Sequence, residues 1–200
     1  MEKRISKAYS CYFEGQQEKK YFKHISKKLS EYNRNISIKF NEVEKLKTLD
    51  RGSTGLKKIA FFDYDCNQVN FEQCVCMCKK TKPYYTNLNF DLWLLLHKKQ
   101  FAKVVSNNND YQNEIREVYN LPKNANIKNE KTIDKMLEQI GLEEIEFAIN
   151  NAKEIMNRKT PEDIKYINKF IYYDNPSMNI HEFIDELFFE IKRDYGIDKF

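Results

Sequence analysis

The sequence predicts an α/β protein: a mainly parallel sheet sandwiched by helices, followed by a helical C-terminal portion. Three observations carry this prediction. Short buried-strand patterns alternate with amphipathic helix patterns through the first half of the chain. Gly and Pro are scarce, at 5 and 4 residues, which argues against an all-β chain with many tight turns. Beyond residue 105, helix patterns replace the strand patterns.

The first half of the chain alternates between strands and helices. Residues 8–13 (AYSCYF) are short, apolar and aromatic, as in a buried strand, and Glu14-Gly15 ends this run. Residues 16–32 follow with apolar side chains at helical spacing. The later elements are predicted as a strand at 36–40, a loop at 50–55, a strand at 58–63, a helix at 69–80, a short strand at 83–86 and a helix at 90–99. Strands that alternate with helices favour parallel pairing.

The second half begins with a polar segment at 106–110 (SNNND). Apolar stripes at three-to-four spacing then predict helices at 132–140, 143–156 and 179–195. We therefore expect a sheet domain at residues 1–105 and a helical extension at residues 106–200 that packs on it.

Composition sets broad limits on function. The formal charge of +4, from 34 basic and 30 acidic residues, is compatible with binding a phosphate backbone but does not require it. No apolar run reaches membrane-spanning length and the N-terminus has no signal-peptide core, so we expect a cytoplasmic protein. The five cysteines, three of them crowded at 74, 76 and 78, favour free thiols over disulfides or a zinc site.

Acidic residues stand at two predicted strand ends. Glu14 ends the first strand, and Asp63 and Asp65 follow the most apolar one. Ligands collect at the carboxyl ends of parallel strands, so the three carboxylates converge if the two strands are neighbours. Such a cluster repels itself unless it holds Mg²⁺ or Mn²⁺, ions suited to stabilising charge on phosphate. The competing interpretation is that the aspartates cap a turn or helix, and the residues alone leave both open.

Several segments together resemble one protein family. They are YFEGQQEKKYF at 12–22, FFDYD at 61–65, TNLNFDLWLLLH at 86–97 and NPSMNIHEFIDEL at 175–187. Their order and spacing are similar to those of the RloB family, bacterial proteins with a Toprim-like domain from restriction-linked and abortive-infection (AbiLii-like) loci. The resemblance covers nearly the whole chain, and the helix that contains Trp93 and His97 is its most specific part.

The resemblance implies a Toprim-like fold, a divalent metal and phosphodiester chemistry. Toprim domains use a Glu after the first strand and a later D-x-D motif, which correspond here to Glu14, Asp63 and Asp65. The family's Thr-Glu pair is replaced by Gln17-Glu18 in this chain. Asp91 stands where the family has a longer Glu, and it could still ligate a metal or order a water.

Other polar residues have both a functional and a structural interpretation. His97 shares a helix face with Trp93 and is either a general base or a core histidine. Asn87 either contacts substrate or caps the next helix. Asp91 lies in a first helical turn, where the helix dipole favours a carboxylate in any case.

Two groups of lysines could face phosphate. They are Lys19, Lys20 and Lys23 on the first helix, and one of Lys123, Lys128 and Lys131, in a region where the family tends to place a lysine. For the first group, a solvated helix face is slightly favoured over a phosphate-binding patch.

We therefore predict a Toprim-type nuclease that uses Mg²⁺ or Mn²⁺, cuts DNA or RNA and acts as the effector of a phage-defence system. Glu14, Asp63, Asp65 and His97 are the predicted catalytic residues, and Asp91 joins the three carboxylates as a predicted metal ligand. The family resembles the smaller partner of an ATPase-plus-Toprim pair, which implies an ABC-like ATPase as regulator.

Two alternatives stay open. One is a primase-like nucleotidyl transferase, and the other is a non-catalytic, nucleic-acid-binding or regulatory subunit of the ATPase. The three carboxylates favour catalysis, because a pure binding module gains nothing from negative charge beside phosphate.

Overall fold

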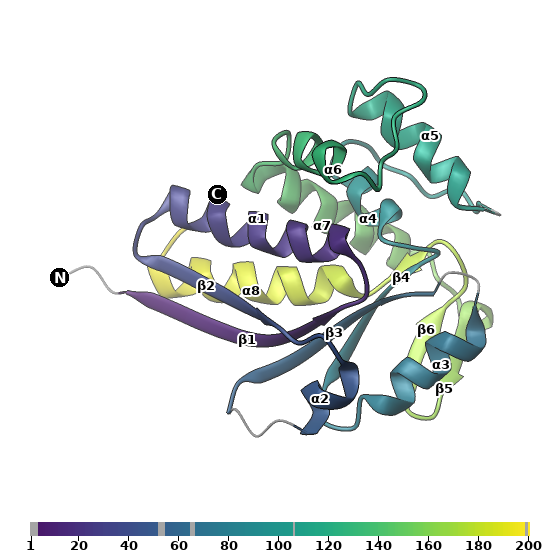
Figure 1. The fold of residues 1–200 in the computed structure, drawn as a ribbon, viewed down its shortest axis with the longest axis horizontal. Coiled ribbons are helices and arrows are strands. Elements are labelled where there is room, and N and C mark those ends of the chain that lie inside the picture. Colours follow the sequence, from purple (N-terminus) through teal and green to yellow (C-terminus); the bar gives the residue numbers. More distant parts are fainter. Residues whose placement is uncertain (1–3, 52–54, 65–66, 106, 199) are drawn as a thin grey trace.

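The computed structural model describes residues 4–51, 55–64, 67–105, 107–198 and 200 (Figure 1). Its centre is a five-stranded sheet with the order β2-β1-β3-β4-β7. The strands are β1 (Ile5–Phe13), β2 (Ile36–Glu42), β3 (Lys57–Asp63), β4 (Lys82–Asn87) and β7 (Ser177–Met178). The first four are parallel, and β7 pairs antiparallel with β4. The predicted α/β fold with a mainly parallel sheet is therefore confirmed.

Helices connect the strands and cover the sheet. They are α1 (Gln16–Tyr32), α2 (Leu46–Arg51), α3 (Gln68–Met77), α4 (Asp91–Leu96), α5 (Asn108–Val118), α6 (Glu130–Leu137), α7 (Leu142–Asn157) and α8 (Ile180–Tyr195), with a 3-10 turn at Pro161–Asp163. The helix α1 has the bounds that its apolar spacing predicts, whereas other predicted helices differ by a few residues at their ends. Within the described ranges, no helix is long and apolar enough to cross a membrane.

The predicted loop at 50–55 is only partly described. Its first two residues end α2, and residues 52–54 lie outside the described residues. The short helix α2 lies in the crossover from β2 to β3, where the sequence predicts no helix. A six-residue helix carries too little periodicity to be recognised beside a polar stretch.

The C-terminal portion contains strands as well as the helices predicted for it. The strands β5 (Ile164–Ile167) and β6 (Phe170–Tyr173) form an antiparallel hairpin, and β7 extends the main sheet. The helices predicted after residue 105 are present as α6, α7 and α8, and the three short strands are additions that the sequence does not predict. These strands are two to four residues long, and Ser177 before an apolar stripe has the sequence pattern of a helix start.

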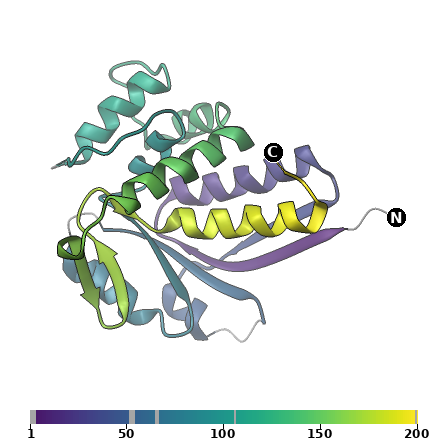
Figure 2. The ribbon, with the colours of Figure 1, turned by 180° about the vertical axis from the view of Figure 1, so that it is seen from behind.

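Side chains of the central strands point alternately to the two faces of the sheet, and each face has its own hydrophobic core. Cys11, Phe61 and Tyr84 point into the larger core, which α1, α4, α7 and α8 also fill. Phe62 and Tyr85 point to the opposite face, where α2, α3 and the β5–β6 hairpin cover the sheet. Figures 1 and 2 show this division, with α1 and α8 on one side of the sheet and α2, α3 and the hairpin on the other.

Phe183 of α8 lies at the centre of the larger core. Its ring is 5.2 Å from that of Tyr9 in β1, 5.8 Å from that of Phe61 in β3 and 5.5 Å from that of Tyr84 in β4, measured between centroids. It also contacts Phe22 of α1 at 6.0 Å. One side chain near the C-terminus thus joins three strands and the first helix.

Candidate active site

Glu14 and Asp63 meet at the carboxyl edge of the sheet. Glu14 directly follows β1, and Asp63 is the last residue of β3, the parallel neighbour of β1. Oε2 of Glu14 accepts a hydrogen bond from the backbone N–H of Asp63 at 2.9 Å, although 49 positions separate the two residues. The convergence of these two strand ends is as the sequence predicts. Asp65, the third predicted carboxylate, lies outside the described residues.

Thr86 of β4 orients the Asp63 carboxylate. Its hydroxyl donates to Oδ1 of Asp63 at 2.6 Å, and the register places Thr86 directly opposite Asp63. The backbone N–H of Tyr64 in turn donates to the carbonyl of Thr86 at 3.0 Å. The aspartate is therefore held by the next strand of the sheet, with one carboxylate oxygen committed to a hydrogen bond.

Glu18 is a further carboxylate of this edge, and the sequence reasoning noted it only as a departure from the family pattern. The side chain is buried, and a β-carbon at Gly15 would lie 2.7 Å from its Oε2. A larger residue at position 15 would therefore force the Glu18 carboxylate to shift. The backbone conformation does not itself call for glycine, because a φ of −127° is open to any residue. Burial raises the pKa of Glu18 to about 7; its own backbone N–H and Lys128 oppose that shift, while Glu14 and Asp91 add to it.

Asp91 and Lys128 form an ion pair beside Glu18. Asp91 is the first residue of α4 and is fully buried, and its Oδ1 accepts from Nζ of Lys128 at 2.9 Å. Nζ also donates to Oε1 of Gln17 at 2.6 Å, while Nε2 of Gln17 donates to the carbonyl of Ile127 at 3.3 Å. Oδ2 of Asp91 is buried and has no hydrogen-bond partner among the residues that the structure describes. This arrangement distinguishes Lys128 from Lys123 and Lys131 as the lysine that contacts the acidic cluster.

His97 is held inside the larger core. Nδ1 donates to the carbonyl of Trp93 at 2.8 Å, so Nε2 accepts the hydroxyl of Tyr21 at 2.9 Å in the neutral ring. Burial lowers the pKa of His97 to about 3. With both ring nitrogens bonded inside the protein, the contacts favour the core-histidine interpretation, and a catalytic role stays a prediction.

Two of the three candidate lysines of α1 are paired with acidic side chains, and the third, Lys23, is exposed. Lys19 forms an ion pair with Glu42 at 2.5 Å, and Lys20 pairs with Glu130 at 2.9 Å and Asp134 at 2.7 Å. These contacts favour a solvated helix face over a phosphate-binding patch. Asn87 is buried at the end of β4, and its Nδ2 donates to the carbonyl of Tyr173 at 3.1 Å rather than capping α4.

The carboxylates of Glu14, Glu18, Asp63 and Asp91 form the acidic edge of the sheet. They offer the hard oxygen donors that Mg²⁺ and Mn²⁺ prefer. Within the described ranges, no three His, Cys, Asp or Glu side chains are close enough together to hold a metal ion. Glu14 and Asp63 are adjacent, and a third ligand at this position would have to come from Asp65 or from a shift of Glu18 or Asp91. The donor chemistry fits a divalent cation, and the metal site itself stays a prediction.

The site lies within a region shared with known proteins. Residues 10–187 match the family model described as RloB-like protein. No curated protein and no solved structure matches the chain. The matched region extends from β1 into α8 and includes every predicted site residue.

Proposed function

This chain belongs to the RloB-like family, and from that premise and its acidic edge we propose that it is a divalent-metal-dependent nuclease. The observation that carries the proposal is the hydrogen bond between Glu14 and the Asp63 backbone, which joins the ends of two neighbouring parallel strands. Acidic residues placed at that edge repel one another, and Glu18 already has a raised pKa partly because of Glu14 and Asp91. A bound cation offsets this repulsion.

Glu14, Asp63 and Asp65 would hold the ion, with Asp91 as a further candidate ligand. Bound Mg²⁺ or Mn²⁺ supplies charge stabilisation at a phosphate and activates a water. Thr86 orients the Asp63 carboxylate through its hydrogen bond to Oδ1. Lys128 forms an ion pair with Asp91, and its positive charge beside the cluster suits an approaching phosphate.

The proposed cellular role is that of effector in a phage-defence system, regulated by an ABC-like ATPase. The support for this role is membership of the RloB-like family together with the resemblance of its members to the smaller partner of an ATPase-plus-Toprim pair. DNA and RNA are both candidate substrates.

The direct test is cleavage of DNA and RNA, side by side, with Mg²⁺, with Mn²⁺ and with EDTA. Glu14→Gln, Asp63→Asn and Asp65→Asn should each lose cleavage, by roughly a thousandfold or more, because each removes an anionic ligand while keeping the side-chain shape. Glu117→Gln is the matched control, because it neutralises an exposed carboxylate on α5.

In cells, co-expression with the ATPase should arrest growth or protect against phage only when the three carboxylates are intact. Full toxicity in all three folded variants would contradict catalysis, and the chain would then be a non-catalytic subunit of the ATPase. Metal-dependent extension of a nucleic acid in place of cleavage would identify a nucleotidyl transferase.

A further inference from the structure

The β5–β6 hairpin presents an exposed apolar face. In its register Ile164 pairs with Tyr173 and Tyr166 pairs with Ile171, so these four side chains share one face. The opposite face holds Ile167, Phe170 and Tyr172 against the core beside α3. On the outer face Tyr166 is 64% exposed and Ile171 is 45% exposed. The outer face of this two-stranded sheet therefore consists of two tyrosines and two isoleucines.

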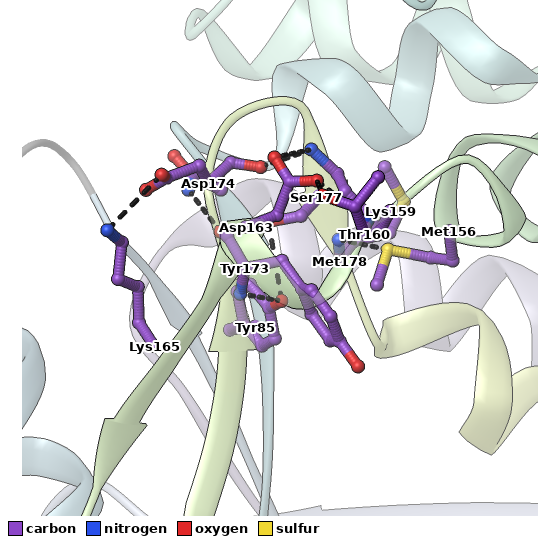
Figure 3. A network of polar contacts seen from close by, with 11 residues as sticks. Tyr85, Met156, Lys159, Thr160, Asp163, Lys165, Tyr173, Asp174, Ser177 and Met178 are labelled. Atoms are coloured by element: carbon purple, nitrogen blue, oxygen red, sulfur yellow. Dashed lines mark hydrogen bonds and ion pairs between the residues drawn. The ribbon is translucent and has the colours of Figure 1, made fainter.

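The hairpin is fixed to the same strand end that orients Asp63. The Tyr85 hydroxyl accepts from the backbone N–H of Tyr173 at 3.1 Å, and Asn87 donates to the carbonyl of Tyr173. Thr86, between these two residues of β4, bonds Asp63. Figure 3 shows the bonds that anchor the base of the hairpin, with the Tyr173 ring directed away from them.

A second contact links the hairpin to the residue after Asp63. The ring of Tyr64 lies 5.9 Å from that of Tyr172, between centroids, and both pack against Phe71 of α3. The inner face of the hairpin is thus part of the wall next to the acidic edge.

Charge favours a polyanion on this hairpin. Residues 164–173 include Lys165 and Lys169 and no acidic residue, but Lys165 lies on the inner face and pairs with Asp174, so Lys169 at the turn supplies the positive charge. At the turn, Nδ2 of Asn168 donates to Sγ of Cys76 at the end of α3, and Lys79 follows three residues later. The two aspartates at the base of the hairpin are already engaged, Asp163 with Thr160 and Asp174 with Lys165 (Figure 3).

We propose that the outer face of the β5–β6 hairpin binds unpaired bases of a nucleic acid strand whose phosphate backbone runs towards the acidic edge. This inference rests on the proposed nuclease function for its substrate class. Tyrosine rings offer their faces to any base, but a base can stack on them only when it is not already paired and stacked in a duplex. Lys169 contributes sequence-independent attraction to phosphate.

The test is equilibrium binding of short fluorescent oligonucleotides by the full chain in EDTA, where no metal-dependent cleavage occurs. Single-stranded RNA, single-stranded DNA and the two matching duplexes are compared. Single strands should bind more tightly than duplexes, and Tyr166→Ala should weaken single-strand binding about tenfold, the loss of one stacked base. Tyr166→Phe should bind like the wild type because it keeps the ring.

Phe189→Ala is the matched control. Phe189 is also an aromatic residue that is 64% exposed, but it lies on α8 across the sheet, and its loss should leave binding unchanged. Lys169→Gln should lower the slope of log affinity against log salt by about 0.7 for single strands. Unchanged binding by Tyr166→Ala, equal losses for Tyr166→Ala and Phe189→Ala, or tighter binding of duplexes would each overturn the proposal.

The two proposals fail separately. Cleavage that persists while Tyr166→Ala binds single strands like the wild type would leave the nuclease in place and remove the hairpin surface. Single-strand binding that depends on Tyr166 without any cleavage would do the reverse. A Tyr166→Ala chain that binds oligonucleotides normally but loses association with the ATPase would show a protein-docking surface, which also overturns the proposal.

Discussion

Lys128→Met tests the central polar contact of the site without any assay of activity. The change removes the ammonium group and keeps most of the aliphatic stem. It leaves Asp91, a fully buried carboxylate, without the partner that now lies 2.9 Å away. Its other oxygen is already buried and has no partner in the described part of the chain, so no donor there compensates.

The expected cost follows from the unequal exposure of the pair. Removing one partner of a buried ion pair typically costs about 3–5 kcal/mol, because a buried charge is left uncompensated. The Lys128 side chain is 43% exposed, so water can reach part of the vacated space, and we expect about 2–3 kcal/mol. For a chain of this length that corresponds to a fall in Tm of about 4–12 °C.

The reverse deletion should be milder. Asp91→Asn leaves Lys128 in contact with Gln17 and water, so it should cost less than about 1 kcal/mol. The double variant should recover most of the stability that Lys128→Met loses, because no buried charge remains. The measurement is urea unfolding and thermal melting of all four chains in EDTA, which keeps cations away from Asp91. A Lys128→Met chain within about 0.5 kcal/mol of wild type, or a double variant no more stable than Lys128→Met, would refute this reasoning.

Three further outcomes are expected. Trp93 is fully buried, so Trp93→Ala should lower the free energy of unfolding by about 3–5 kcal/mol, measured in urea. Burial lowers the pKa of His97 to about 3, so between about pH 6.5 and pH 3 the unfolded chain binds a proton at His97 and the native chain does not. The free energy of unfolding should therefore fall from pH 7 to pH 4. His97→Gln should make that fall smaller. A folded His97→Gln chain that keeps its cleavage would assign His97 to packing, whereas loss of cleavage would support catalysis. Burial raises the pKa of Glu18 to about 7, so above pH 4.5 the native chain keeps a proton that the unfolded chain loses, and this lowers stability. Glu18→Gln should remove that cost: its gain in the free energy of unfolding should be absent near pH 4, grow towards pH 7 and level off at about 1–3 kcal/mol. A gain that is equal at all pH values would contradict the assigned titration.

The sequence predicted the sheet and its acidic edge because both depend on strong local patterns. The run at 58–63 reads as a buried strand in any context, and the chain reversal after Glu14 places a carboxylate at a strand end. From those two facts, parallel pairing alone brings Glu14 to Asp63. Trp93 and its neighbours were recognisable as core because apolar residues dominate that short helix.

The contacts that the sequence did not reveal depend on distant residues. Lys128 reaches Asp91 from a loop 37 positions away, and nothing in the local sequence distinguishes it from Lys123 or Lys131. Glu18 looks like an ordinary first-turn glutamate, and only its burial beneath Gly15 sets it apart. A signal was present in the Glu-Gly pair, since a glycine after a strand-end glutamate leaves space for another side chain.

The position of Phe183 governs when the protein can fold during synthesis. The chain emerges from the ribosome N-terminus first, so β1, β3 and β4 are made long before the ring that joins them. Until α8 appears, the face of the sheet that α1 and α8 share lacks part of its cover. We expect this face to pack fully only when translation is nearly complete. Chains truncated before α8 would then lack the ring that joins the three strands, so the length of chain already made would decide whether this core can close.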